Sequence, residues 1–103
     1  MDRLTRQRLI GEKVMVSRVV LEKGCRVPSH GHENEQITCV ISGALRFGLG
    51  AEGSPAYRQV MVSTGEVIRL PSMFPHSAEA LEETVVLDIF APPSEKTGID
   101  RSH

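Results

Sequence analysis

Hydrophobic and polar residues alternate along most of this chain with the two-residue period of β-strands. Apolar side chains, many of them β-branched, recur in short runs separated by glycine, proline, serine and other turn residues. These runs cover residues 14–21, 36–41, 44–49, 57–62, 66–70 and 84–90. Short strands at a spacing of roughly ten residues are typical of an all-β sandwich or barrel. We therefore expect an all-β fold, either a sandwich or a small β-barrel.

Helix signals are weak. Residues 2–9 suggest at most a short N-terminal turn, and residues 78–83 have a helix-favouring composition over six positions only. The chain has 103 residues, which leaves room for one hydrophobic core. We expect a single domain over residues 1–103, with residues 1–12 as an N-terminal arm and residues 94–103 as a loosely held polar tail.

The charge and composition of the chain limit the kinds of binding partner that we expect. The formal net charge is −1 and the basic residues are scattered, so nothing predicts nucleic-acid binding. No apolar run approaches the roughly 20 residues that span a bilayer. The charged N-terminus lacks the apolar segment of a secretion signal. We expect a cytoplasmic protein that binds a small molecule and no membrane, with Cys25 and Cys39 as reduced thiols rather than a disulfide.

Three of the four histidines are candidates for one metal site. His30 and His32 form His-Gly-His, which on a strand places two imidazoles on one face, about 6.5–7 Å apart at the backbone. Gln36 has the same parity and offers an amide oxygen. His76 must arrive from another strand, after a proline-rich approach over residues 71–75. This neutral set suits one divalent transition metal such as Ni, Zn, Fe or Mn.

Other interpretations of these residues stay open at this point. His-x-His alone also occurs as ordinary surface or core histidines. Glu35 would replace Gln36 as a ligand if the strand register slipped by one residue. Cys25 lies close enough in the sequence to ligate as a thiolate, although the other ligands make this unnecessary. A purely structural zinc site would be closed and richer in cysteine.

The spacing of these residues resembles the two motifs of the cupin family. The matching positions are Gly24, His30, His32, Gln36 and Gly43 in the first motif, and Gly65, Pro71 and His76 in the second. Gln36 stands where the family has glutamate, Met73 where it has glycine and Ala80 where it has asparagine. The resemblance implies a double-stranded β-helix of the jelly-roll type, with two antiparallel sheets and the metal inside.

Within that family, the chain is similar to small single-domain cupins of pectin degradation, which open the ring of unsaturated uronate sugars. The resemblance extends to residues 87–93, where it implies that Asp88 and Phe90 line the pocket. That subgroup commonly has an arginine directly after the two prolines, where this chain has Ser94. Another cation would then have to meet a uronate carboxylate, and Arg46, Arg58 and Arg69 are the candidates.

Asp88 also stands out without the resemblance. It lies in an otherwise apolar strand on the parity of Val86 and Phe90, and an inward carboxylate is costly unless it is hydrogen-bonded, paired or close to a metal. It is either a solvent-facing residue at a bulge or edge, or a general acid or base beside the metal. Arg69 is either a solvated strand residue or part of the substrate pocket with Phe90.

The opposite face of the same strands is apolar too. The residues with this parity are Ile37, Cys39, Ile41, Val85, Leu87 and Ile89. Strands that are apolar on both faces are covered on both faces, and a chain of this length has no second layer to offer. A homodimer is therefore expected.

Two classes of function follow. The first is a metal-dependent enzyme of carbohydrate metabolism that opens or isomerises an unsaturated sugar acid, with Asp88 as the catalytic residue; an iron-dependent dioxygenase is a second enzymatic option. The alternative is a non-catalytic ligand-binding or sensor barrel with a structural metal. An enzyme requires Asp88 to lie near the metal, whereas a binding module tolerates Asp88 in solvent.

Overall fold

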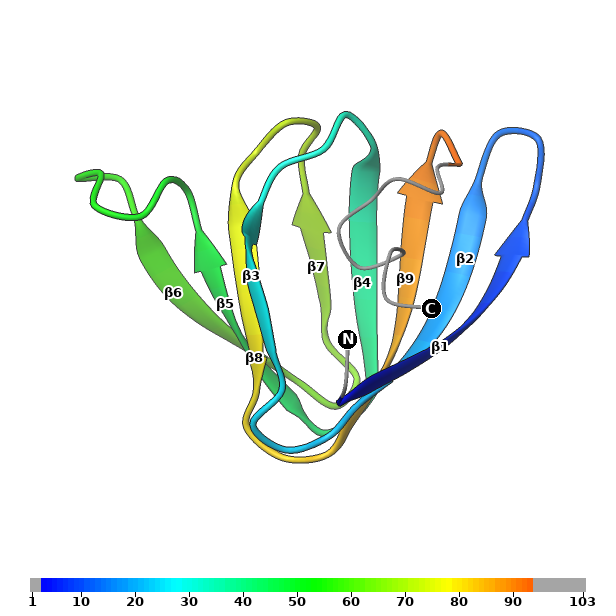
Figure 1. Cartoon of the computed structure of the whole chain (residues 1–103), viewed down its shortest axis with the longest axis horizontal. Coiled ribbons are helices and arrows are strands. Elements are labelled where there is room, and N and C mark those ends of the chain that lie inside the picture. Colours follow the sequence, from blue (N-terminus) through cyan, green and yellow to red (C-terminus); the bar gives the residue numbers. More distant parts are fainter. Residues whose placement is uncertain (1–2, 94–103) are drawn as a thin grey trace.

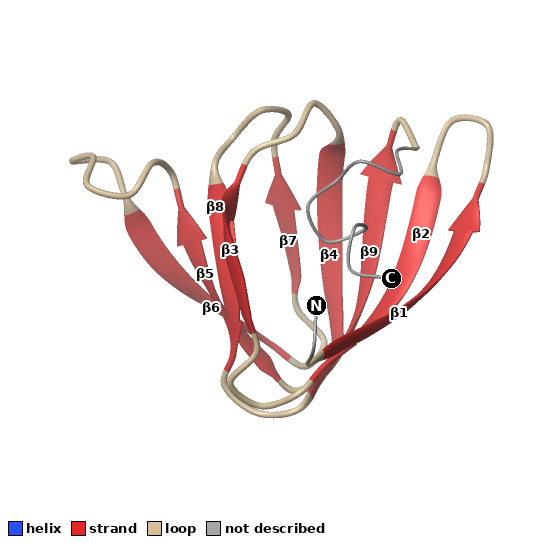
Figure 2. Cartoon of the chain, viewed as in Figure 1, coloured by secondary structure: helices blue, strands red, loops and turns tan. Residues whose placement is uncertain are grey.

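The computed structural model describes residues 3–93, and within this range the chain forms nine β-strands and no helix (Figures 1 and 2). The strands are β1 (Leu4–Ile10), β2 (Met15–Leu21), β3 (Arg26–His30), β4 (Glu35–Ser42), β5 (Ala44–Leu49), β6 (Arg58–Ser63), β7 (Val67–Leu70), β8 (His76–Ala80) and β9 (Thr84–Ala91). No segment of the described range forms a helix long and apolar enough to cross a membrane.

The strands form two antiparallel sheets that face each other. The five-stranded sheet has the order β1-β2-β9-β4-β7, and the four-stranded sheet has the order β3-β8-β5-β6. Figure 1 shows the two sheets converging at one end and opening at the other. Every strand pair is antiparallel, as in the jelly-roll barrel expected from the sequence.

The alternation seen in the sequence decides which side chains enter the barrel. Strand β9 lies between β2 and β4, and its buried residues are Thr84, Val86, Asp88 and Phe90. The intervening residues point to the outer face and are half-buried. Apolar side chains from both sheets, such as Val40 and Phe47, fill the space between them. A polar residue at a buried position of such a strand, as Asp88 is in β9, therefore lies inside the core.

Three strands, β1, β3 and β8, lie outside the apolar runs that predicted strands. Residues 4–10, expected within an N-terminal arm, pair with β2 over seven residues as β1. Residues 76–80 form β8, although part of that segment has a helix-favouring composition, because β8 is paired on both sides by β3 and β5. The expected tail of residues 94–103 lies outside the described residues.

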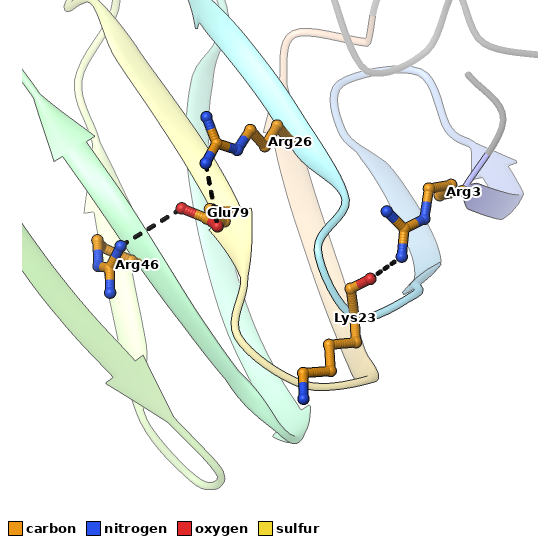
Figure 3. A network of polar contacts seen from close by, with 5 residues as sticks. All are labelled: Arg3, Lys23, Arg26, Arg46 and Glu79. Carbon is orange, nitrogen blue, oxygen red and sulfur yellow. Dashed lines mark hydrogen bonds and ion pairs between the residues drawn. The ribbon is translucent and has the colours of Figure 1, made fainter.

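Ion pairs join strands on the outside of the four-stranded sheet. Glu79 on β8 lies between Arg26 on β3, at 3.6 Å, and Arg46 on β5, at 3.4 Å (Figure 3). Figure 3 also shows Arg3 donating a hydrogen bond to the carbonyl of Lys23, which ties the start of β1 to the turn after β2. Both arginines around Glu79 are substantially exposed, so each pair contributes little to stability.

Candidate metal centre

The three histidines expected to share a metal lie together at the open end of the barrel. His30 ends β3, His76 begins β8, and these two residues are partners in the register of the strand pair. His32 follows in the loop after β3. The ring centroids are 4.5 Å apart for His30 and His76, 5.1 Å for His32 and His76, and 5.4 Å for His30 and His32.

Backbone carbonyls fix the orientation of all three rings. The Nδ1 atoms of His30, His32 and His76 lie 2.8 to 2.9 Å from the carbonyls of Pro28, Asn34 and Phe74, respectively. A carbonyl only accepts, so each Nδ1 carries the proton and each neutral ring presents an unprotonated Nε2. One nitrogen from each ring lies within 4.8 Å of the other two. These histidines could hold one metal ion, with the orienting hydrogen bonds that metal-bound histidines normally make.

Gln36 adds an oxygen to this group. Its amide nitrogen donates to Thr38 Oγ1 at 2.9 Å and to Asp88 Oδ1 at 3.3 Å, which fixes the orientation of the amide. Its Oε1 atom then faces His32 Nε2 at 3.2 Å. When the only ring proton of His32 is the one on Nδ1, both atoms present lone pairs to each other, which is unfavourable unless a cation lies between or beside them.

His76 is the most enclosed member of the cluster. Its side chain is 3% exposed, and its Nε2 atom is buried without a hydrogen-bond partner among the described residues. Burial lowers the pKa of His76 to about 4, against a smaller raising effect of the Phe74 carbonyl. Burial also lowers the pKa of His30. These two rings are therefore neutral near pH 7, the form that binds a metal.

The chemistry of this donor set fits a divalent transition metal. The three imidazoles are ligands of intermediate softness and the amide oxygen is a hard ligand, and nitrogen-rich sites of this kind suit Zn, Ni, Fe or Mn. Two features of the site favour a bound cation: the buried Nε2 atom of His76 has no partner among the described residues, and the acceptor atoms of His32 and Gln36 face each other. The residues that would hold it are His30, His32, His76 and Gln36.

A cavity of about 20 Å³ lies directly inside the cluster. Its polar lining residues are His30, Gln36, Thr38, His76, Ser77 and Asp88. Asp88 is 1% exposed, which excludes the solvent-facing alternative, and its Oδ1 accepts a hydrogen bond from Thr38 Oγ1 at 2.6 Å. The Gln36 amide therefore connects the carboxylate to the histidines through one side chain.

The other residues predicted for the site divide into two groups. Phe90 is fully buried, and its ring centroid lies 5.8 Å from that of His32, so it forms a wall of the cluster. Arg69 does not reach the cavity: it lies on the outer face of the sheet, where its Nε donates to Glu35 at 2.6 Å. Glu35, the alternative metal ligand, takes part in this ion pair and does not lie in the histidine cluster. The reason is parity, because Arg69 pairs with Ile37, which faces outward.

Two further expectations concerned arginine and cysteine. Arg46 lies on the outer face beside Glu79, and Arg58 is exposed at the first residue of β6. Neither lines the cavity.

Cys25 is buried in the hydrophobic core and is not a member of the histidine cluster, and both Cys25 and Cys39 are free thiols. Burial raises the pKa of Cys25, which further disfavours a thiolate.

The sequence predicted no role for two residues that contribute to the site, Asn34 and Thr38. Asn34 holds His32 through its carbonyl, and its side chain donates to the carbonyl of Pro92, which joins the His32 loop to the end of β9. Thr38 fixes both Gln36 and Asp88. The parity of Thr38 was a usable signal, since a hydroxyl two residues after Gln36 on the inner face must find a partner.

Comparison with known proteins agrees with this geometry. The family model described as a cupin domain matches residues 17–90, which include the three histidines, Gln36 and Asp88. The chain therefore belongs to the cupin family. No curated protein matches the chain.

Solved structures give the same fold. KdgF from Halomonas sp. is 28% identical, with a TM-score of 0.78 over 92% of this chain and 85% of KdgF. An RmlC-like cupin from Shewanella frigidimarina is 21% identical, with a TM-score of 0.80 over 90% of this chain and 79% of that one, which shows the fold alone. Oxalate decarboxylase from Bacillus subtilis, described with Mn(II) centres, is 26% identical, with a TM-score of 0.74 over 84% of this chain and 23% of that one.

Proposed function

We propose that this cupin is a metal-dependent enzyme that acts on a small polar substrate. The observation that carries the proposal is the Gln36 side chain, which offers its oxygen to the histidine cluster and its nitrogen to a buried carboxylate. A structural metal site needs no carboxylate beside it. A buried Asp88 is costly, and proton transfer is a function that would retain it there.

Each residue then has a distinct role. His30, His32, His76 and Gln36 would hold the metal, which would supply Lewis acidity toward a carbonyl or hydroxyl oxygen of the substrate. Asp88 accepts or donates the proton that moves in the reaction. Thr38 orients that carboxylate through the 2.6 Å hydrogen bond to Oδ1. Phe90 and the apolar residues around the cavity keep bulk water away from it.

The substrate class that we favour is an unsaturated sugar acid, whose ring would be opened or isomerised. The support is the resemblance to the small cupins of pectin degradation, together with the similarity to KdgF. Carbohydrate metabolism in the cytoplasm is the setting that this substrate implies. Because the cavity is about 20 Å³, only the reacting end of such a substrate reaches Asp88, and the remainder lies at the mouth of the barrel.

The size of the cavity also favours a second candidate, a non-catalytic barrel in which the metal is structural. A space for about one water molecule suits an ion and its bound water better than a whole ligand. In this alternative Asp88 only holds Gln36 in place. The two functions therefore differ in whether Asp88 moves a proton.

The variant Asp88→Asn separates them, because it keeps the size of the side chain and can still bond to its neighbours. We expect it to bind metal at wild-type stoichiometry and to lose at least about a hundredfold in turnover in a screen of unsaturated sugar acids. Ser77→Ala is the control, since Ser77 lines the same cavity without contacting Asp88 in any hydrogen bond of the described residues. Turnover by Asp88→Asn at the wild-type rate would exclude the catalytic role.

A further inference from the structure

A groove of about 370 Å³ lies on the outer face of the four-stranded sheet, on the side away from the histidine cluster. Its volume falls in the range of ligand pockets, about 300–1,000 Å³, whereas the cavity inside the barrel is about 20 Å³. The groove therefore has room for a whole small molecule, which the inner cavity does not. All four strands of the sheet contribute to its lining, among them Arg26 of β3, Glu79 of β8, Arg46 and Gly48 of β5, and Gln59 of β6.

A row of three charged side chains lines one part of this groove. In the strand register Glu79 is the partner of Arg26 on one side and of Arg46 on the other. Figure 3 shows the carboxylate between the two guanidinium groups, and each of its oxygens contacts one arginine, at 3.6 and 3.4 Å. Neither arginine makes another hydrogen bond or ion pair with a described residue. Most of the five N–H donors of each guanidinium are therefore open to a ligand.

Tyr57 adds an aromatic ring to the groove. It directly precedes β6, and its hydroxyl accepts a hydrogen bond from Gln59 Nε2 at 3.3 Å. Gly48 allows the ring to lie close to the sheet, because a Cβ at that position would be 2.6 Å from Tyr57 Oη. The hydroxyl proton of Tyr57 is not donated to any described residue. The tyrosine therefore offers a ligand both an apolar ring face and a hydrogen-bond donor.

The formal charges around the groove cancel. Besides the two arginines and Glu79, the lining includes Glu52 from the loop between β5 and β6. An anion on the arginines would meet the Glu79 carboxylate between them, and like charges repel each other. A zwitterion would find no separate positive and negative ends on this row. A neutral ligand avoids both costs if its groups donate and accept hydrogen bonds at once, as hydroxyl groups do.

We propose that this groove binds an uncharged saccharide. Adjacent hydroxyl groups of the ligand accept hydrogen bonds from Arg26 and Arg46 and donate to Glu79, and the C–H face of a sugar ring packs against Tyr57. The ligand class follows from the balance of charge and of hydrogen-bonding groups in the groove. Because the groove lies outside the barrel, binding there needs neither the metal nor Asp88. The inference therefore does not depend on the reaction proposed above.

The test uses Tyr57 as a reporter. The chain has one tyrosine and no tryptophan, so its intrinsic fluorescence near 300 nm, of the order expected for tyrosine, comes from the groove alone. The full chain as purified is titrated with maltose, cellobiose and lactose, and with inorganic phosphate as the anionic probe. We expect at least one disaccharide to change the fluorescence saturably, with a Kd of about 1 mM or tighter, and phosphate to have no effect at the same concentrations. Titration calorimetry checks each affinity independently.

Variants of the charged row separate a saccharide from an anion. Arg46→Gln should weaken disaccharide binding about tenfold, because it removes a charged hydrogen-bond donor. Arg26→Gln should weaken it as well, and with a side chain that is 78% exposed it should fold normally. Glu79→Gln should also weaken a saccharide, which loses a charged acceptor, whereas it would tighten the binding of an anion. Arg58→Gln is the matched control, because Arg58 is exposed at the start of β6 and does not line the groove.

Three results would overturn the proposal. The first is a wild type that binds none of the three disaccharides in either titration. The second is binding of phosphate that Glu79→Gln tightens, which would make the groove an anion site. The third is disaccharide binding that both Arg26→Gln and Arg46→Gln leave unchanged, or that Arg58→Gln reduces equally, since either outcome would place the ligand elsewhere.

Discussion

Gln36 is the residue on which the chemistry of this barrel depends. Its amide has two different ends, and the structure uses both: the oxygen faces His32 Nε2 and the nitrogen faces Thr38 and Asp88. A glutamate at this position would add a negative charge next to the buried carboxylate of Asp88, which like-charge repulsion disfavours. The glutamine therefore allows a neutral ligand and a carboxylate to lie side by side.

Thr38 holds this arrangement in place, and its removal should be measurable. Thr38→Val preserves the shape of the side chain but removes the hydroxyl that contacts Gln36 and Asp88. We expect a loss of about 1–3 kcal/mol in the free energy of unfolding and a loss of about 10–100-fold in metal affinity. Urea denaturation and metal titration measure the two effects. The control is Thr5→Val, at an exposed position on β1, which should change neither the stability nor the metal affinity. An unchanged metal affinity in Thr38→Val would show that the Gln36 amide needs no hydrogen bond from Thr38.

The metal-free protein should lose stability in acid because of His76. Its pKa is about 4 in the folded chain and about 6.5 in the unfolded chain. Between these values the unfolded chain binds more protons, so stability is complete above about pH 6.5 and falls as the pH is lowered toward 4, by on the order of 3 kcal/mol. Urea denaturation of the chelated protein at several pH values measures the fall. The decline should be smaller in His76→Gln, and equal declines would contradict this origin.

Parity along one strand predicted only part of the site, and its failures have a physical cause. It gave Asp88 its inward position. It also grouped His30, His32 and Gln36 on one continuous strand, whereas His30 ends β3, His32 lies in the following loop and Gln36 is on β4 of the other sheet. For Arg69 the sequence leaves open whether it lies in solvent or in the pocket, and only the pairing with Ile37 shows that it faces outward. A register between strands is a tertiary property that one sequence does not contain.

At the scale of elements, the sequence predicted the strands that are apolar and missed those that are polar. Strand β3 has only one buried residue and contains Pro28, which its place at the edge of the sheet tolerates. Strand β8 consists of residues without strong strand preference, and it forms because β3 and β5 pair with it on both sides. These two strands carry His30 and His76, so the functional elements were also the least predictable ones.

The turn between β4 and β5 depends on Gly43. This glycine has a φ of +105°, and a Cβ added there would lie 2.5 Å from Thr84 Oγ1 and 2.6 Å from the Glu83 carbonyl. Gly43→Ala should therefore cost more than about 2 kcal/mol in the free energy of unfolding. Gly53→Ala, with a φ of +85° and open space around it, should cost only about 1 kcal/mol. Thermal or urea denaturation gives both values, and equal costs would show that the close contacts around Gly43 relax.

The outer face of the five-stranded sheet bears on the oligomeric state of the molecule. The expected apolar residues on β4 and β9 do face outward, most of them half-buried, with Ile41 52% exposed and Val67 on β7 60% exposed. Within the described chain the second sheet covers only the inner face, and no layer covers the outer one. The homodimer stays a prediction, in which a second copy covers this face.

Light scattering during size-exclusion chromatography tests the dimer. The wild type should have twice the mass of one chain, because burial of this face removes apolar area from water. Leu87→Glu places a charge at the centre of the face and should give monomers. Met61→Glu, at an exposed position on the other sheet, should stay dimeric. A monomeric wild type, or a dimeric Leu87→Glu, would exclude this interface.

The central claim is that His30, His32, His76 and Gln36 hold one divalent transition metal inside a cupin barrel. Its most direct test is the metal content of protein purified without chelator, measured by elemental mass spectrometry for the wild type, His32→Ala and His103→Ala. We predict close to one ion per chain in the wild type and in His103→Ala, and almost none in His32→Ala, with all three folded by circular dichroism. A metal-free wild type, or a His32→Ala variant that keeps the full metal content, would contradict the account.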